Sequence, residues 1–192
     1  MRKGKLSRKT AETEITISLD LDGSGQSDIE TGIGFLDHML ELFTFHSGID
    51  LQVKATGDID VDGHHTVEDI GLVLGQALKE ALGDKIGISR YGNFLLPMDE
   101  TLAQIALDIS GRPYLVYKCE FIRVDLGQLD VQNIKEFFKS LCNTLGLTLH
   151  INVLYGENDH HKAEAIFKGF GRAMRQAIAL TGSRLESTKG VI

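Results

Sequence analysis

The chain has 192 residues, of which 42% are hydrophobic and 24% are charged, so it can bury a core of ordinary globular size. Its net charge of -7, without a basic stripe, argues against broad binding of nucleic acid. No apolar run approaches the roughly 20 residues that cross a bilayer, no signal-peptide pattern follows the basic start, and the two Cys residues lack disulfide or metal-motif spacing, so we expect a cytoplasmic protein with no membrane contact.

The first half of the chain alternates predicted strands and helices. Residues 12–23 (ETEITISLDLDG) alternate apolar and polar side chains, which predicts a strand. A turn is predicted over 23–30 and a helix over 35–45. A strand over 51–55 and a helix over 64–82 complete this half.

The second half repeats this order. A strand is predicted over 100–111 (ETLAQIALDISG), followed by a second strand within 111–124. A helix over 131–142, a strand over 148–154 and a helix over 160–178 then follow.

The two halves also share sequence. The helices over 64–82 and 160–178 both begin His-His-x-x-Glu and carry a Gly seven residues after that Glu. Such matches indicate an internal duplication, with half-repeats 1–90 and 91–192 that together form one compact domain. The predicted fold class is α+β: a duplicated strand-strand-helix-strand-helix unit, with two sheets packed through a helical layer.

The repeated His-His-x-x-Glu pattern is the main chemical signal. Residues three and four apart share a helix face, so each Glu can lie beside a His of its own motif. Adjacent helical residues point about 100° apart, so one ion is not expected to take both His rings. Imidazole and carboxylate donors without thiolate suit Mn²⁺, Fe²⁺ or Zn²⁺, although a single such motif is more often a solvated helix face. The six candidates are His64, His65, Glu68, His160, His161 and Glu164.

Four further residues carry weaker signals. His38 lies on the helix predicted over 35–45, and Glu136 is its counterpart in the second half; each is either a metal ligand or a surface group. His46 either lines a site or caps the same helix. His150 lies in an apolar strand, which predicts a hydrogen-bonded histidine in the core.

Cations in Gly-bounded turns suggest an anionic ligand. Arg90 and Arg112 lie in such turns, and the tail contains Ser187, Thr188 and Lys189. Arg binds phosphate through a planar fork and Lys through a point charge, although each residue alone is more often a surface cation. The tail either folds over a ligand or stays loose.

The motifs together resemble the imidazoleglycerol-phosphate dehydratase family. FLDHML, GDIDVDGHHTVED, RYG, PMDE, DISGRP, TLHI, GENDHHKAEAIFK and STKG occur in the family's order, from about Arg8 to Val191. The resemblance implies removal of water from D-erythro-imidazole glycerol 3-phosphate, giving imidazole acetol phosphate, in L-histidine biosynthesis. It also implies two Mn²⁺ ions per active site and a homo-oligomer of 24 subunits with sites between subunits.

The family motifs also assign residue roles. The implied metal ligands are His38, His64, His65, Glu68, Glu136, His160, His161 and Glu164. Some family members have His where this chain has Glu136. The implied substrate contacts are Glu12, His38, His46, His64, Glu68, Arg90, Arg112, His160, Ser187, Thr188 and Lys189. We expect Glu12 to be the acid/base, with Glu164 or Glu68 as the alternatives. Judged from the residues alone, a binuclear metallohydrolase and a metal-storing particle remain open.

Overall fold

The computed structural model describes residues 2–192. The first half contains β1 (Lys3–Lys9), β2 (Thr13–Asp20), β3 (Ser27–Glu30), α1 (Gly34–Ser47), β4 (Asp50–Gly57) and α2 (His64–Leu82). The second half contains β5 (Tyr91–Met98), β6 (Thr101–Asp108), β7 (Tyr114–Lys118), α3 (Val131–Leu145), β10 (Thr148–Tyr155) and α4 (Asp159–Ala177), with a short hairpin of β8 (Asp125–Leu126) and β9 (Leu129–Asp130) before α3.

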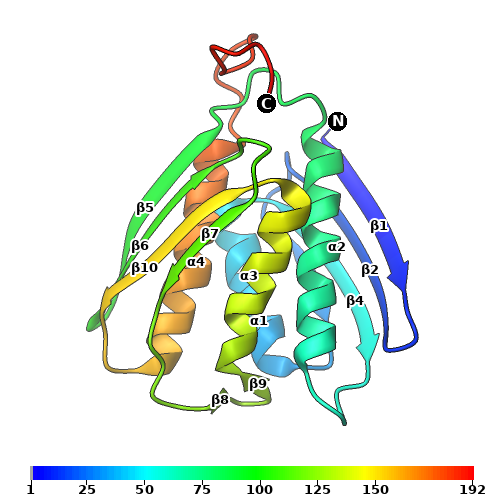
Figure 1. Ribbon diagram of the computed structural model, residues 1–192, viewed down its shortest axis with the longest axis vertical. Helices are drawn as coiled ribbons and strands as arrows, with labels where there is room; N and C mark the ends of the chain where they lie inside the picture. Colours follow the sequence, from blue (N-terminus) through cyan, green and yellow to red (C-terminus); the bar gives the residue numbers. More distant parts are fainter. Residues whose placement is uncertain (1) are drawn as a thin grey trace.

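Each half builds one four-stranded sheet, and the two sheets have the same topology. Their strand orders are β1-β2-β4-β3 and β5-β6-β10-β7. In each sheet the last pair is parallel, because a helix crosses over between its two strands. The four helices lie between the sheets (Figure 1). The predicted α+β class, the repeat and the helical layer between two sheets are confirmed.

The structure adds one strand to the start of each half-repeat. β1 (KGKLSRK) and β5 (YGNFLLPM) pair antiparallel with β2 and β6. Both lack a clear apolar alternation because each places a Gly on its inner face: a Cβ on Gly4 or Gly92 would collide with the backbone of α2 or α4. The predicted turn over 23–30 is partly wrong, since Ser27–Glu30 forms a short edge strand there.

The prediction that His150 lies in the core is wrong. Leu149 and Ile151 are fully buried and face the helices, whereas His150 is exposed. Side chains alternate between the two faces of a strand, so His150 lies on the outer face, opposite Ala106 and Val116.

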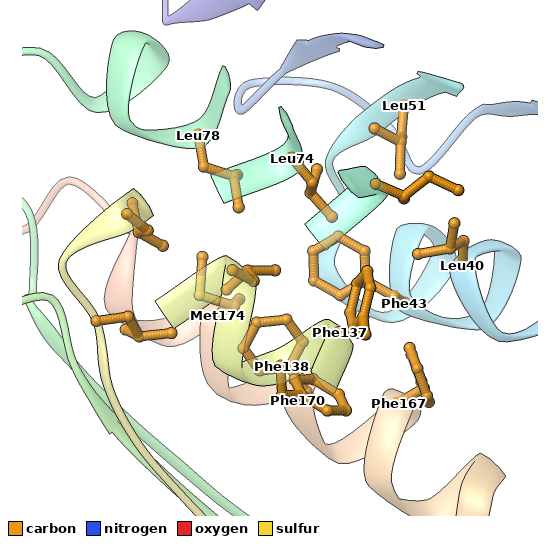
Figure 2. Close-up of a cluster of buried hydrophobic side chains, with 14 of the residues drawn as sticks. Leu40, Phe43, Leu51, Leu74, Leu78, Phe137, Phe138, Phe167, Phe170 and Met174 are labelled. Atoms are coloured by element: carbon orange, nitrogen blue, oxygen red, sulfur yellow. The ribbon is translucent and has the colours of Figure 1, made fainter. Parts of the chain in front are cut away.

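The helices pair across the two halves. α1 packs against α4, and α2 packs against α3. The glycines of the repeated helices permit this approach, because a Cβ on Gly75 would overlap α3 and a Cβ on Gly171 would overlap α1. Aromatic rings fill the centre of the layer: Phe43 stacks on Phe170 with centroids 5.2 Å apart, and Phe138 meets Phe170 edge-on (Figure 2).

All four helices point the same way, so their N-terminal ends gather at the lower end of the molecule in Figure 1. The His-His-x-x-Glu motifs open α2 and α4 at that end. The C-terminal ends of the helices and the chain's tail lie at the opposite end. Within residues 2–192, no helix is both long and apolar enough to cross a membrane.

The outer faces of the two sheets differ in character. On the β1-β2-β4-β3 sheet the outward residues of the paired strands are polar, as in the pairs Lys5–Ser18 and Thr16–Lys54. The outer face of the second sheet instead presents large apolar side chains, including Tyr91, Leu95, Tyr114 and Leu154, each between 46% and 64% exposed. Because the two sheets share one topology, the fold itself does not require this apolar face.

Candidate metal and substrate site

One group of possible metal ligands forms where α1 meets α4. His38 Nε2 lies 3.0 Å from Glu164 Oε1, and His160 Nε2 lies 3.2 Å from the same oxygen. The ligand atoms of the three residues all fall within 4.8 Å of one another. Residues 126 positions apart are brought together because the helices pair across the halves.

Lys168 holds the other oxygen of this carboxylate. Its Nζ donates to Glu164 Oε2 over 2.7 Å, one helical turn further along α4. Burial opposes ionisation of Glu164, but the hydrogen bonds from Lys168 and His38 outweigh it and lower the pKa of the carboxyl to about 2. Glu164 is therefore a fixed anion whose Oε1 faces the two imidazoles.

A related but more open group lies where α2 meets α3. His64 Nε2 lies 3.8 Å from Glu68 Oε2, and His64 Nδ1 lies 3.1 Å from Asn133 Oδ1. Glu136 lines the same cavity as His64, of about 600 Å³, and accepts a hydrogen bond of 2.7 Å from Lys139. The two groups thus correspond: His64 and Glu68 on α2 match His160 and Glu164 on α4, and Glu136 on α3 matches His38 on α1.

The second His of each motif points away from the first. The His64 and His65 rings are nearly perpendicular, at 84°, and the His160 and His161 rings meet at 88°. The angular separation expected on a helix is therefore present. Each second His belongs to a different set of carboxylates from its neighbour.

These carboxylates stand at the loops and strand ends beside the helices. His65 Nδ1 lies 3.1 Å from Asp58 Oδ2 and 3.8 Å from Glu12 Oε2, and the Asp58 carboxylate raises the pKa of His65. His161 Nδ1 lies 2.7 Å from Glu100 Oε2, which raises the pKa of His161. Glu12 thus lies beside His65, and not beside His64 or the Glu164 group.

Two acidic residues fix the N-terminal end of α4. The Oε1 atom of Glu100 accepts the backbone N–H groups of Glu157 and Asn158. The Asp159 carboxylate accepts the N–H groups of Ile122 and Arg123, and is only 4% exposed. Through these bonds the start of α4, and with it His160, is tied to two separate loops.

The predicted phosphate-binding residues gather at the other end of the molecule. Arg90 lies in the left-handed region at φ 68° and donates two hydrogen bonds to Asp108, of 2.6 and 3.0 Å, and one to the Glu186 carbonyl. It lines one pocket with Ser187 and Thr188. Arg112 and Lys189 line a neighbouring pocket beside the C-terminal end of α3.

His46 is separate from both sets. It lies eight residues after His38, which is about 12 Å along α1. Its Cβ is close to Gly171 of α4. Burial, together with the charges of Arg172 and Lys168, lowers the pKa of His46.

The sequence left several neighbours of the site unassigned. Glu100 is the counterpart of Glu12 in the repeated Glu-Thr pair, so the repeat itself could have indicated it. Lys168 follows Glu164 by four residues, a spacing that predicts a helical ion pair. Asp58 and Asn133 have no such signal, because only the tertiary structure brings them to His65 and His64.

The profile of the imidazoleglycerol-phosphate dehydratase family matches residues 31–174, which include both His-His-x-x-Glu motifs. The chain belongs to the imidazoleglycerol-phosphate dehydratase family. Similar proteins of this name come from Geobacter sulfurreducens, 57% identical with 98% of each chain covered, and from Clostridium botulinum, 54% identical over 100% of this chain and 98% of the relative. The family membership predicted from the motifs is confirmed.

Solved structures of the family have the same fold. The imidazoleglycerol-phosphate dehydratase of Staphylococcus aureus superposes with a TM-score of 0.85 at 44% identity, covering 93% of this chain and 99% of that one. The enzyme of Pyrococcus furiosus, solved in complex with (S)-C348, superposes with a TM-score of 0.85 at 41% identity, covering 97% of this chain and all of the other. The dehydratase class therefore rests on both sequence and fold, and the clustered imidazoles and carboxylate fit a metal cofactor.

Proposed function

We propose that this chain removes water from imidazole glycerol phosphate, giving imidazole acetol phosphate, and uses two Mn²⁺ ions per active site. The observation that carries the metal part of this proposal is the group formed by His38, His160 and Glu164. The predicted residue roles are part of the same proposal.

The donor atoms fit a divalent cation of this kind. In octahedral coordination with bonds of about 2.1 Å, neighbouring ligand atoms stand about 3 Å apart. The two distances to Glu164 Oε1, of 3.0 Å from His38 Nε2 and 3.2 Å from His160 Nε2, match that spacing. Imidazole nitrogen and carboxylate oxygen are donors that Mn²⁺ accepts.

The corresponding group of His64, Glu68 and Glu136 would hold the second ion. It is more open, with His64 and Glu68 side chains 42% and 41% exposed. His65 and His161 face other directions, so we propose that they complete the coordination of these two ions in a neighbouring copy of the chain. Their carboxylate neighbours Asp58 and Glu100 orient the rings through Nδ1 and leave Nε2 as the donor atom.

The reaction must move a proton from carbon to a base and return a proton to the departing hydroxyl. A divalent ion held by the His38, His160 and Glu164 group would act as a Lewis acid on the substrate's imidazole, which would lower the pKa of the ring N–H. We assign the proton transfer to Glu12, whose carboxylate is 54% exposed and lies 3.8 Å from His65. A half-exposed carboxylate can reach a substrate without first breaking a buried ion pair.

One chain alone cannot place both the metal ligands and the phosphate-binding residues on one substrate. His64 opens α2, and Lys79, which lines the pocket of Arg112 and Lys189, lies in its last turn. Fifteen residues of helix separate them by about 22 Å. A three-carbon side chain with a phosphate is shorter than this, so the basic end of one copy must meet the histidine end of another. This supports the proposed homo-oligomer, whose number of 24 subunits rests on the family resemblance.

The apolar outer face of the β5-β6-β10-β7 sheet gives a second reason to expect association. Tyr91, Leu95 and Tyr114 are each more than half exposed, although the corresponding sheet presents polar residues. Exposed apolar side chains on one sheet face can mark a binding face, and here they are interspersed with polar neighbours such as Gln104, opposite Leu95. We also propose that the protein works in the cytoplasm, consistent with the free thiols of Cys119 and Cys142.

The first test is turnover of imidazole glycerol phosphate by metal-stripped protein, with and without added Mn²⁺, Fe²⁺ or Zn²⁺. Product is followed through the ultraviolet absorbance of its enol in alkali. Product that depends on Mn²⁺ supports the proposal. Phosphate release without the enol would indicate a metallohydrolase, and metal binding without any product would indicate a storage protein.

A further inference from the structure

A strongly basic pocket lies at the C-terminal ends of α2 and α3. Its volume is about 450 Å³, and its lining includes Lys79, Lys85, Arg112 and Lys189, no Asp or Glu side chain, and Ile192, whose terminal carboxylate is the one anionic group of the lining. Only the last two of these cations were predicted to bind phosphate. Four positive charges around one cavity favour an anionic occupant.

Lys85 is the unusual member of this set. It is only 8% exposed, and within residues 2–192 its Nζ has no hydrogen bond or ion pair. Buried ammonium groups are normally paired, because transfer from water without a partner is costly. Burial, followed by the charges of Lys79 and Arg90, lowers the pKa of Lys85, while the charge of Asp108 opposes this.

The backbone at Lys85 is also unusual. Its φ of 62° lies in the left-handed region, where residues other than Gly, Asn and Asp are uncommon. This conformation brings the Lys85 side chain into the pocket, where Nζ lies 3.8 Å from the position that a Cβ on Gly111 would take. Gly111 directly precedes Arg112, so the Lys85 ammonium stands beside the turn that carries the predicted phosphate ligand. Strained backbone of this kind is concentrated at functional sites.

The neighbouring cation Arg90 is in a different state. Two of its N–H groups are bound to the Asp108 carboxylate and a third to the Glu186 carbonyl. Its charge is largely neutralised, and its contacts hold the tail against β6. Arg112 lies 3.8 Å from the same Asp108 and is 65% exposed. The buried charge that still lacks a partner is therefore that of Lys85.

We propose that Lys85 is a phosphate-binding residue of the enzyme, which meets the phosphoryl group of the substrate together with Arg112 and Lys189, with Lys79 adding charge at the rim. The proposal rests on the placement of the substrate phosphate in this pocket. An ammonium acts on phosphate as a point charge, so Lys85 supplies attraction while the guanidinium of Arg112 supplies orientation. A Cβ on Gly111 would stand 3.1 Å from the Ile192 carbonyl carbon, so the glycine leaves room for the chain's tail beside Lys85.

The test uses the assembled, Mn²⁺-loaded enzyme and three variants at one position. Lys85→Met removes the charge, Lys85→Arg keeps it, and Lys85→Gly removes it while relieving the left-handed backbone. Lys54→Met is the control, because Lys54 is an exposed, ion-paired lysine on the outer face of the other sheet, and its loss changes net charge equally. For each, kcat, KM and the inhibition constant of inorganic phosphate are measured, with assembly size checked by light scattering.

We expect Lys85→Met and Lys85→Gly to raise KM and the phosphate inhibition constant in parallel, by about 10- to 100-fold, as for loss of a charged hydrogen bond. Arg should recover most of the loss, kcat should change little, and Lys54→Met should behave as wild type. Equal KM values for Lys85→Met and Lys85→Gly would show that the lost charge, and not the left-handed backbone, causes the effect.

Three other outcomes overturn the proposal in different ways. If Arg112→Met and Lys189→Met raise KM but Lys85→Met and Lys85→Gly do not, Lys85 has no role in binding the substrate. If none of these substitutions changes KM, the phosphate lies elsewhere and the residue roles of the proposed function are wrong as well. Loss of inorganic phosphate inhibition with an unchanged KM would mean that Lys85 binds a free anion and not the substrate.

Discussion

Asp159 and Lys162 form a buried ion pair at the start of α4. We expect that substituting Asp159 lowers the free energy of unfolding more than substituting Lys162. The Asp159 and Lys162 side chains are only 2% and 6% exposed, and their charged atoms lie 2.8 Å apart. Asp159 also accepts two backbone N–H groups, at 2.7 and 2.8 Å, from the loop before β8. Lys162 has one further acceptor, the Glu120 carbonyl at 2.9 Å.

The two substitutions differ because each leaves a different charged group buried. Asp159→Asn leaves the Lys162 ammonium buried without an opposite charge, which costs about 3–5 kcal/mol. Lys162→Met leaves the carboxylate with its two backbone donors, so the loss should be close to that of one charged hydrogen bond, about 1.5–3 kcal/mol. The double variant should be destabilised by less than the sum, because residues in one network couple by about 0.5–3 kcal/mol.

The assay is denaturant-induced unfolding of the metal-free protein, at one protein concentration for all variants because subunit association adds to apparent stability. The pH dependence provides a second measurement. Burial opposes ionisation of Asp159, but the hydrogen bonds from Lys162 and the backbone outweigh it and lower the pKa of the carboxyl. Its stabilising contribution is therefore complete above the unfolded pKa near 3.9 and is lost as pH falls through the lower folded value.

The wild type and Asp159→Asn should accordingly converge in stability below about pH 4. The prediction would be refuted if Lys162→Met lowered the free energy of unfolding at pH 7 by more than Asp159→Asn. Strict additivity of the two substitutions would refute it equally, because it would mean that the pair does not interact.

Three further predictions concern packing, catalysis and thiol reactivity. Gly92→Ala should destabilise by about 1–3 kcal/mol, since its Cβ would collide with the α4 backbone, whereas Gly34→Ala, which meets nothing within 4 Å, should be neutral or stabilising in thermal unfolding. Glu12→Gln should lower kcat by at least about 100-fold while metal content, measured by atomic emission, stays unchanged. Cys119 should resist iodoacetamide at pH 8 in the native protein and react on unfolding, because burial raises the pKa of its thiol to about 12.

Each of these has a clear contrary result. Equal stability of Gly92→Ala and Gly34→Ala would show that the strand can move away from α4 at no cost. Near-normal turnover by Glu12→Gln would reassign the proton transfer to another group. Rapid alkylation of the native thiol would show that the pKa of Cys119 is not raised by its partial burial.

The sequence predicted the helices far better than the edge strands. The helix over 64–82 was predicted with the bounds it has in the structure, because its apolar spacing is sustained over five turns. β1 was missed because only Leu6 is apolar in KGKLSRK and the inward position next to it is a Gly. His150 was misplaced because apolar neighbours in the chain suggested a buried strand, while β10 has one face to solvent.

The site was predicted in its members but not in its grouping. The 100° separation of adjacent helical residues correctly indicated that His64 and His65 face different partners. The sequence did not indicate that His38 would meet Glu164 of the opposite half, since helix patterns specify an apolar face but not the helix that covers it.

The packing of each half's helices against those of the other half has a consequence for how the chain can be divided. A break in the loop between Leu82 and Tyr91 would give two pieces, each with a complete sheet and two helices whose faces toward the other half would be uncovered. Neither piece can bury those faces alone, so the two should fold only on mixing, as a complementing pair. A single unit of this kind, before any duplication, would have needed a second copy of itself to close its helical layer, and its paired ligands would have formed between identical chains. Joining two units end to end turned that encounter into an intramolecular one and allowed the two ligand groups to differ, one with His38 and the other with Glu136.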